Sequence, residues 1–168
     1  AAAVALAEGL TWQEIEQGLL QSQSQLRMAT TRAFNGALIL DDSYNAAPES
    51  TMAALDLLAE VHPGTHRHIA VLGEMYELGQ YEYQGHQQVG IRAAQTCQVL
   101  IAVGDRSKII AEAAVQSGMK PQAIQWMATV QEAIEFLKSS LRETDVILIK
   151  GSHGLRMDRI TWALETTL

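Results

Sequence analysis

Short apolar runs alternate along the chain with longer segments in which apolar residues recur at helical spacing. The short runs are typical of strands buried on both faces, and the longer segments are typical of helices that cover a sheet. Strands are expected at residues 68–72, 99–103, 123–127 and 146–149. Helices are expected at residues 48–61, 84–96, 107–117, 130–141 and 155–164. This alternation predicts right-handed βαβ units and a parallel sheet covered on both faces.

A hairpin is expected ahead of these units. Met28 to Phe34 is strand-like, Asn35-Gly36 is a two-residue hairpin signal, and Ala37 to Leu40 returns as an antiparallel strand. The predicted fold is therefore a Rossmann-like three-layer α/β sandwich, with a mostly parallel sheet of about six strands and one antiparallel strand.

The first residues have a different character. Ala1 to Ala7 resembles the end of a helix, and Thr11 with Glu14 fits a capping box that starts a second helix, which runs to about residue 20. Residues 21–25 are polar and are expected to form a linker. We therefore expect residues 1–25 to be the tail of a preceding domain plus a linker, and residues 26–168 to form the sandwich.

Composition and charge argue against some classes of function. The chain is 48% hydrophobic and 18% charged, which is ordinary for a globular domain, and its net charge of −7 argues against a nucleic-acid binder. It contains no stretch typical of a membrane span. Cys97 is the only cysteine, so an intrachain disulfide is impossible and a reducing, cytoplasmic location is expected.

Polar residues follow three of the expected strands. Asp41-Asp42 and the turn after them come first, then Gly73-Glu74, then Lys150 with Ser152. The carboxyl ends of parallel strands meet at one rim, where α/β sheets bind ligands, so these residues are candidates for holding a polar ligand. The spacing leaves equally open that the two aspartates only cap the turn and that Lys150 is an ordinary strand-end residue.

Other polar or aromatic residues receive structural interpretations. Asp105 is interpreted as a helix N-cap, and the histidines around Pro63-Gly64 as a loop rather than a metal site. The tryptophans are expected in the core or half-buried; they are Trp12, Trp126 and Trp162. The patterns of a phosphate loop, a dinucleotide fingerprint and a serine nucleophile turn are all absent. We therefore expect that the chain does not catalyse a reaction alone.

Three motifs together carry a resemblance. Residues 41–50 read Asp-Asp-Ser-Tyr-Asn-Ala-Ala-Pro-Glu-Ser, residues 68–79 read His-Ile-Ala-Val-Leu-Gly-Glu-Met-Tyr-Glu-Leu-Gly, and residues 147–154 read Ile-Leu-Ile-Lys-Gly-Ser-His-Gly. In this order and spacing they resemble the Mur ligases of bacterial cell-wall synthesis, and among these the members that add D-alanyl-D-alanine. The resemblance covers about residues 27–164.

The resemblance implies a three-domain enzyme of which this chain is the C-terminal Rossmann-like domain. In such enzymes ATP, with Mg²⁺, activates the carboxylate of UDP-N-acetylmuramoyl-tripeptide as an acyl phosphate, which the amino group of D-alanyl-D-alanine then attacks. A central ATPase domain holds most of the nucleotide and is the expected partner. No catalytic residue, metal or bound cofactor is then expected in this fragment.

The resemblance also implies roles for single residues. Arg27 and Asp42 match positions that contact ATP, and Asn45, in the same loop as Asp42, is a further ATP candidate. Lys150 and Ser152 match the stretch assigned to D-alanyl-D-alanine, and His153 follows them as a further candidate for this substrate. Two positions depart from the family pattern: Ala47 stands where a second Asn is usual, and His153 stands where Arg is common.

Two alternatives remain. A phosphoacceptor receiver domain also has an early acidic pair and a late lysine, and Asp105 would then be the phosphorylated residue. Another ligase of the wider family, such as a folylpolyglutamate synthetase or the diaminopimelate-adding Mur ligase, would share the domain. Tyr44-Asn45 favours the D-alanyl-D-alanine enzymes over the diaminopimelate enzyme, which typically has Tyr-Ala-His there.

Overall fold

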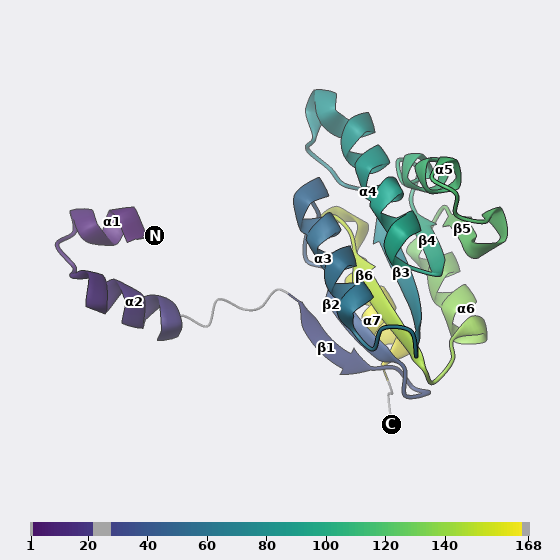
Figure 1. Ribbon diagram of the computed structural model, residues 1–168, viewed down its shortest axis with the longest axis horizontal. Helices are drawn as coiled ribbons and strands as arrows, with labels where there is room; N and C mark the ends of the chain where they lie inside the picture. Colours follow the sequence, from purple (N-terminus) through teal and green to yellow (C-terminus); the bar gives the residue numbers. More distant parts are fainter. Residues whose placement is uncertain (1, 22–27, 166–168) are drawn as a thin grey trace.

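The computed structural model describes residues 2–21 and 28–165 (Figure 1). Its main feature is a six-stranded sheet in the order β1-β2-β6-β3-β4-β5. β1 pairs with β2 antiparallel, and the other neighbours pair in parallel. The strands are β1 (Ala29–Arg32), β2 (Leu38–Asp42), β3 (Arg67–Gly73), β4 (Val99–Val103), β5 (Ile124–Met127) and β6 (Asp145–Lys150). The predicted sheet, with its single antiparallel strand, is confirmed.

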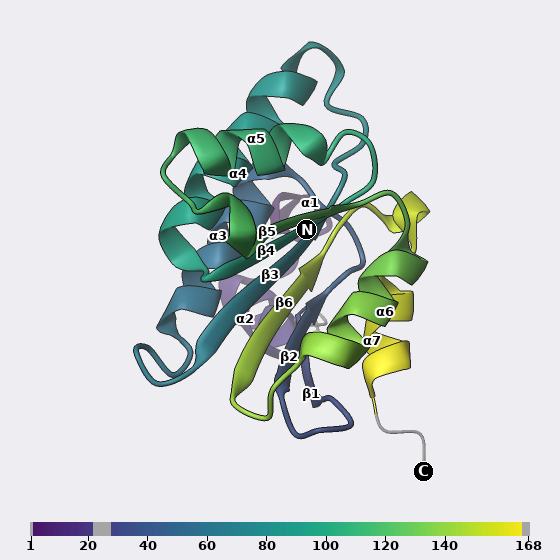
Figure 2. The ribbon, with the colours of Figure 1, turned by 90° about the vertical axis from the view of Figure 1, so that its right-hand side faces the viewer.

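Helices cover both faces of this sheet, as Figure 2 shows. α3, α4 and α5 lie on one face, and α6 and α7 lie on the other. The helices are α3 (Pro48–Glu60), α4 (Glu82–Thr96), α5 (Lys108–Gln116), α6 (Val130–Ser140) and α7 (Asp158–Leu164). Single 3-10 turns are η1 (Gly79–Tyr81), η2 (Pro121–Ala123) and η3 (His153–Leu155). The three-layer sandwich is therefore confirmed.

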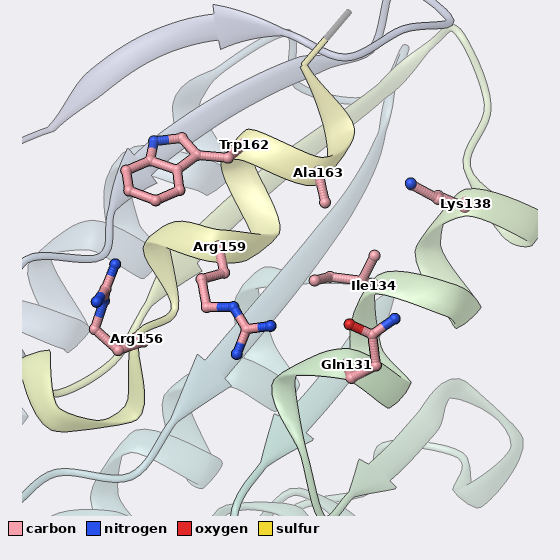
Figure 3. Close-up of a pocket in the computed structure, with 7 residues that line it drawn as sticks. All are labelled: Gln131, Ile134, Lys138, Arg156, Arg159, Trp162 and Ala163. Atoms are coloured by element: carbon pink, nitrogen blue, oxygen red, sulfur yellow. The ribbon is translucent and has the colours of Figure 1, made fainter. Parts of the chain in front are cut away.

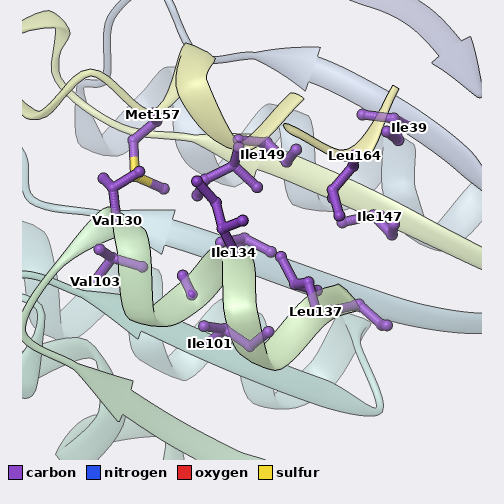
Figure 4. Packing of buried hydrophobic residues seen from close by; sticks show 14 of the residues in the cluster. Ile39, Ile101, Val103, Val130, Ile134, Leu137, Ile147, Ile149, Met157 and Leu164 are labelled. Atoms are coloured by element: carbon purple, nitrogen blue, oxygen red, sulfur yellow. The ribbon is translucent and has the colours of Figure 1, made fainter. Parts of the chain in front are cut away.

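The middle residues of the central strands β6, β3 and β4 are apolar because successive side chains enter opposite cores. On β6, Ile147 and Ile149 pack beneath α6 and α7, whereas Val146 and Leu148 pack beneath α3 and α4. Figure 4 shows the first of these cores, in which Ile134 of α6 lies over the strand residues. A polar side chain on a central strand is therefore shielded from water unless it lies at the strand's end.

Three expectations, on the hairpin loop, the last helix and the tryptophans, need correction. The hairpin loop has three residues rather than two, because Ala33 pairs with Ala37 and the N–H of Phe34 donates to the carbonyl of Leu164 instead of entering the ladder. The last helix begins at Asp158 rather than residue 155, because Arg156 takes a left-handed backbone with a φ of 56° that breaks the helix.

The third correction concerns the tryptophans. Trp12 and Trp162 are exposed by 68% and 61%, so the expectation that they lie in the core or are half-buried is wrong for both. Trp162 lies on the outer side of α7 near the Arg156 guanidinium, which is 5.7 Å from the ring centre. Trp126 is half-exposed, and its indole N–H donates to the carbonyl of Gly104.

The first two helices pack on each other. They are α1 (Ala2–Ala7) and α2 (Trp12–Gln21), and Figure 1 shows them to one side of the sheet. The expected capping box is confirmed, because the Thr11 N–H donates to the Glu14 carboxylate and the Glu14 N–H donates to Thr11 Oγ1. The expected linker falls almost wholly on residues outside the described part of the chain.

Candidate functional site

Three strand ends meet where the direction of the chain changes. β6 lies between β2 and β3, and α7 leaves β6 on one face while α3 and α4 leave the neighbouring strands on the other. The loops after these strands therefore diverge, and a crevice opens at the carboxyl ends, as is typical of open α/β sheets. The strand-end residues singled out from the sequence lie around this crevice.

Asp42 and Lys150 form a shielded ion pair at the base of the crevice. They are register partners on β2 and β6, and Lys150 Nζ lies 2.6 Å from Asp42 Oδ2 and 2.8 Å from the carbonyl oxygen of Asn45. The Lys150 side chain is 2% exposed and that of Asp42 is 14% exposed. Lys150 thus holds the end of β2 and the loop after it together, and its ammonium faces the protein rather than solvent.

The β2 loop is shaped by its own polar side chains. Asp41 Oδ1 accepts from the Ser43 N–H at 2.9 Å, so of the two aspartates Asp41 supports the turn. Asn45 is exposed, and its amide oxygen accepts from the Ala46 N–H. Asp42 Oδ1 receives no hydrogen bond from the described residues, so this oxygen is available to a ligand.

Ser152 fastens the β6 loop to the β3 loop. Its N–H donates to the carbonyl of Glu74, and its Oγ accepts from the Tyr76 N–H at 2.8 Å. The neighbouring His153 is exposed, and its ring lies 5.6 Å from that of Tyr44. Gly73 and Gly151 allow this crossing, because a Cβ on either would lie 3.3 Å or less from the backbone of the other.

The loop after β3 is held by a hydrogen bond to His86 and by a contact between Tyr76 and Arg106. The buried His86 accepts from the Met75 N–H through Nε2, and its Nδ1 lies 2.7 Å from the Glu82 carbonyl, which fits a neutral ring protonated on Nδ1. Burial, followed by the nearby Glu74 carboxylate, raises the pKa of Tyr76 above its usual value. The Arg106 guanidinium lies 5.1 Å from the Tyr76 ring centre. The Tyr76 side chain is therefore held in place where it lines the crevice.

The crevice holds a cavity of about 470 Å³, which we name the rim pocket. It is lined by residues 44–47, 76–78 and 152–154, from the loops after β2, β3 and β6. Of the residues proposed from sequence, Asn45, Ser152 and His153 line it, whereas Asp42 and Lys150 lie beneath it. Arg27 lies outside the described residues. The residues expected to bind ATP and those expected to bind the dipeptide are thus adjacent.

Sequence reasoning missed Tyr76 and Glu77, which also line the rim pocket. The Gly73-Glu74 strand end pointed to this loop, but no local pattern marks the two residues after Met75 as ligand-facing. Asp105 is not the helix cap that was expected, because Ser107 holds that position and the Asp105 carboxylate pairs with Lys108.

A second hollow lies between α6 and α7, away from the strand ends (Figure 3). Figure 3 shows Arg159 and Lys138 projecting from the two helices, with Ile134 and Ala163 between them. Its lining side chains come from α6, α7 and Arg156 just before α7, and none of these lining residues is a buried polar group. We therefore take the rim pocket as the candidate site.

No group of three or more His, Cys, Asp or Glu side chains among the described residues is placed to hold a metal ion. No helix in this part of the chain is long and apolar enough to cross a membrane.

Known structures share the fold. A crystal structure of MurF from Acinetobacter baumannii superposes with a TM-score of 0.73 at 28% sequence identity, covering 95% of this chain and 35% of that chain. MurF ligase from Thermotoga maritima, solved in complex with ADP, superposes with a TM-score of 0.69 at 22% identity, covering 96% of this chain and 35% of that chain.

Sequence comparison agrees. UDP-N-acetylmuramoyl-tripeptide–D-alanyl-D-alanine ligase of Mycobacterium leprae is 34% identical over 171 residues, covering 92% of this chain and 33% of that protein. The Escherichia coli enzyme of the same name is 34% identical over 170 residues, covering 98% of this chain and 35% of that protein. This chain thus spans about a third of the length of these relatives. The family model described as "Mur ligase, glutamate ligase domain" matches residues 26–153, and the chain belongs to this family of Mur ligase C-terminal domains.

Proposed function

We propose that this chain is the C-terminal domain of an ATP-dependent ligase that joins D-alanyl-D-alanine to UDP-N-acetylmuramoyl-tripeptide. The observation that carries the proposal is the family match combined with a rim pocket built from the three motif-bearing loops. The relatives named for this reaction match nearly the whole chain.

The rim supplies half of an active site. The chain has no phosphate loop of its own, so we propose that the triphosphate and Mg²⁺ are held by a central domain that closes against the crevice. The chemistry supplied by that domain is transfer of the ATP γ-phosphoryl group to the tripeptide carboxylate. The amine of the dipeptide then forms the amide bond as inorganic phosphate leaves.

Each residue then has a proposed task. Asp42 accepts a hydrogen bond from the ATP ribose through the unoccupied Oδ1, and Asn45 and Arg27 belong to the nucleotide side. Ser152 and His153 belong to the dipeptide side. Because its ammonium is buried against Asp42, we assign Lys150 a positioning role in place of direct contact with the dipeptide.

Residues 1–25 are proposed to be the tail of that central domain and the linker. The described helices in this segment expose large apolar side chains that an isolated pair of helices leaves uncovered. These side chains are Val4, Leu6, Leu10 and Trp12.

A cytoplasmic location fits the requirement for ATP and the free thiol of Cys97.

The test uses the full-length protein and measures ADP release that depends on both substrates. We expect ligation by the wild type and a large loss of ligation in the Asp42→Ala and Asp42→Asn variants. The second variant is needed because Asp42→Ala leaves the buried Lys150 ammonium without its partner, which destabilises the fold. The control is Asp105→Ala, whose carboxylate is on the surface. Wild-type ligation by Asp42→Asn would refute the assignment.

The same protein tests the receiver alternative. The antiparallel β1 and the family match both disfavour it, since receiver sheets have five strands in the order 2-1-3-4-5. Incubation with acetyl phosphate and Mg²⁺ is expected to leave the mass of the protein unchanged. A gain of one phosphoryl group at Asp105 would support the receiver function instead.

A further inference from the structure

The rim pocket has an unusual charge for a site that serves anionic substrates. Among its lining residues, Glu77 is the only Asp, Glu, Lys or Arg. The cations at this rim in the described part of the chain are each paired with a carboxylate: Lys150 with Asp42, Arg106 with Glu82 at 3.3 Å, and Arg156 with Asp158 at 2.8 Å. The described residues that line the pocket therefore present a negative charge to a ligand and no Lys or Arg side chain.

Glu77 is itself free to bind. Its side chain is exposed, and it makes no hydrogen bond or ion pair with the described residues. An unengaged carboxylate that lines a concave pocket with aromatic side chains has the features of a site for an organic cation, which a carboxylate attracts by charge and an aromatic face by its quadrupole.

The backbone supports this assignment. Glu77 has a φ of 63°, a left-handed conformation that costs a residue with a Cβ about 1 kcal/mol or more and that glycine would adopt freely. The loop is held on both sides, because the Tyr76 N–H donates to Ser152 Oγ and the Leu78 carbonyl accepts from the Tyr81 N–H. Strained residues that are held in place by their neighbours cluster at ligand sites.

We propose that Glu77 binds the primary ammonium group of the amino substrate in the rim pocket, with Tyr76 and Tyr44 beside it. The inference rests on the proposed function and adds the orientation of the substrate: a short zwitterionic peptide enters with its amino end toward the β3 loop. No bond forms or breaks at Glu77. The assignment differs from one based on Lys150, which would have directed the peptide carboxylate to this rim.

The test compares the full-length wild type with Glu77→Gln, which keeps the shape of the side chain and removes its charge. The KM for D-alanyl-D-alanine is expected to rise about tenfold or more, the size of a lost hydrogen bond between charged groups, while the KM for ATP stays unchanged. The second probe is N-propanoyl-D-alanine, which lacks only the amino group. Its inhibition constant is expected to be the same in both proteins.

Two further variants separate the effect of the Glu77 charge from an effect on the stability of the protein. Glu77→Gly removes the backbone strain as well as the carboxylate, so it is expected to be at least as stable as the wild type and yet to show the same rise in KM for the dipeptide. Glu112→Gln removes an exposed carboxylate on α5 that does not line the rim pocket, and it is expected to behave as the wild type.

The outcomes are distinguishable. If the wild type ligates the dipeptide and Glu77→Gln has an unchanged KM for it, the ammonium site is refuted and the proposed function stands. An equal loss of affinity for the dipeptide and for N-propanoyl-D-alanine also refutes it, because the effect would not depend on the amine. A wild type that does not ligate the dipeptide overturns both proposals.

Discussion

Replacing Lys150 by Met tests whether this lysine is a buried structural tie. Met has a similar length and is apolar, so the change leaves no large cavity but removes both the ion pair with Asp42 and the hydrogen bond to the Asn45 carbonyl. Breaking a buried pair by deleting one partner costs about 3–5 kcal/mol. Because Asp42 keeps 14% of its side-chain exposure and can recruit water, we expect a value near the lower limit, about 3 kcal/mol.

The assay is urea unfolding of the 168-residue chain, followed by far-ultraviolet circular dichroism. A loss of about 3 kcal/mol lowers the urea midpoint by roughly 1–2 M for a slope of about 2 kcal/mol/M. The control is Lys138→Met on α6, since Lys138 is exposed and has no ion-pair partner among the described residues; its free energy of unfolding is expected to change by less than about 0.5 kcal/mol.

A double variant isolates the pair itself. Lys150→Met combined with Asp42→Asn removes both charges, so its free energy of unfolding is expected to lie at least about 1 kcal/mol above the value obtained by adding the two single losses. The reasoning is refuted if Lys150→Met unfolds at the same urea concentration as the wild type. In that case the ammonium would face solvent, and its direct contact with a substrate would again be the better assignment.

Three further predictions concern the rest of the fold. Burial raises the pKa of the Cys97 thiol to about 12, so we expect Ellman's reagent at pH 8 to react only after unfolding; reaction of the native chain at the rate of a free thiol would contradict this. Gly90→Ala is expected to cost about 1–3 kcal/mol in urea unfolding, because the added Cβ would lie 2.3 Å from the Ile110 carbonyl oxygen, whereas Gly18→Ala, in open space, is expected to cost nothing. The hydrogen bond from Arg156 lowers the pKa of Asp158 below its usual 3.8. This stabilisation is present above pH 3.8 and is lost as the pH falls through the lower folded pKa, so Asp158→Asn should flatten the acid side of the stability profile, and equal profiles would contradict it.

Local patterns sufficed for most of the fold. Apolar runs of strand length and helical periods placed β3, β4, α3 and α6 within two residues of their observed bounds, because packing on both faces of the sheet requires those patterns. Errors came where a long-range contact overrides a local signal. The Asn35-Gly36 loop gained a residue through the bond to Leu164, and Arg156 interrupts a segment whose apolar period continues.

The candidate site was predicted in part. The rule that parallel strands share a rim was enough to bring Asp42, Ser152 and Lys150 together, although they come from strands far apart in the chain. The sequence did not reveal that the Lys150 ammonium is paired with Asp42 and the Asn45 carbonyl. Nor did it reveal Glu77, because a left-handed backbone at a glutamate has no local signature.

The sequence by itself determined the class of fold, the succession of strands and helices along the chain, and the loops that meet at the rim, because these follow from hydrophobic periodicity and turn chemistry. Only the tertiary structure decided which polar groups at that rim face each other and which face a ligand. The insertion of β6 between β2 and β3 buries Lys150 against Asp42, and the anchoring of the β3 loop by Ser152 and His86 leaves Glu77 as the charge that lines the rim pocket. Burial and pairing depend on strand order and loop contacts between distant residues, which no local pattern specifies.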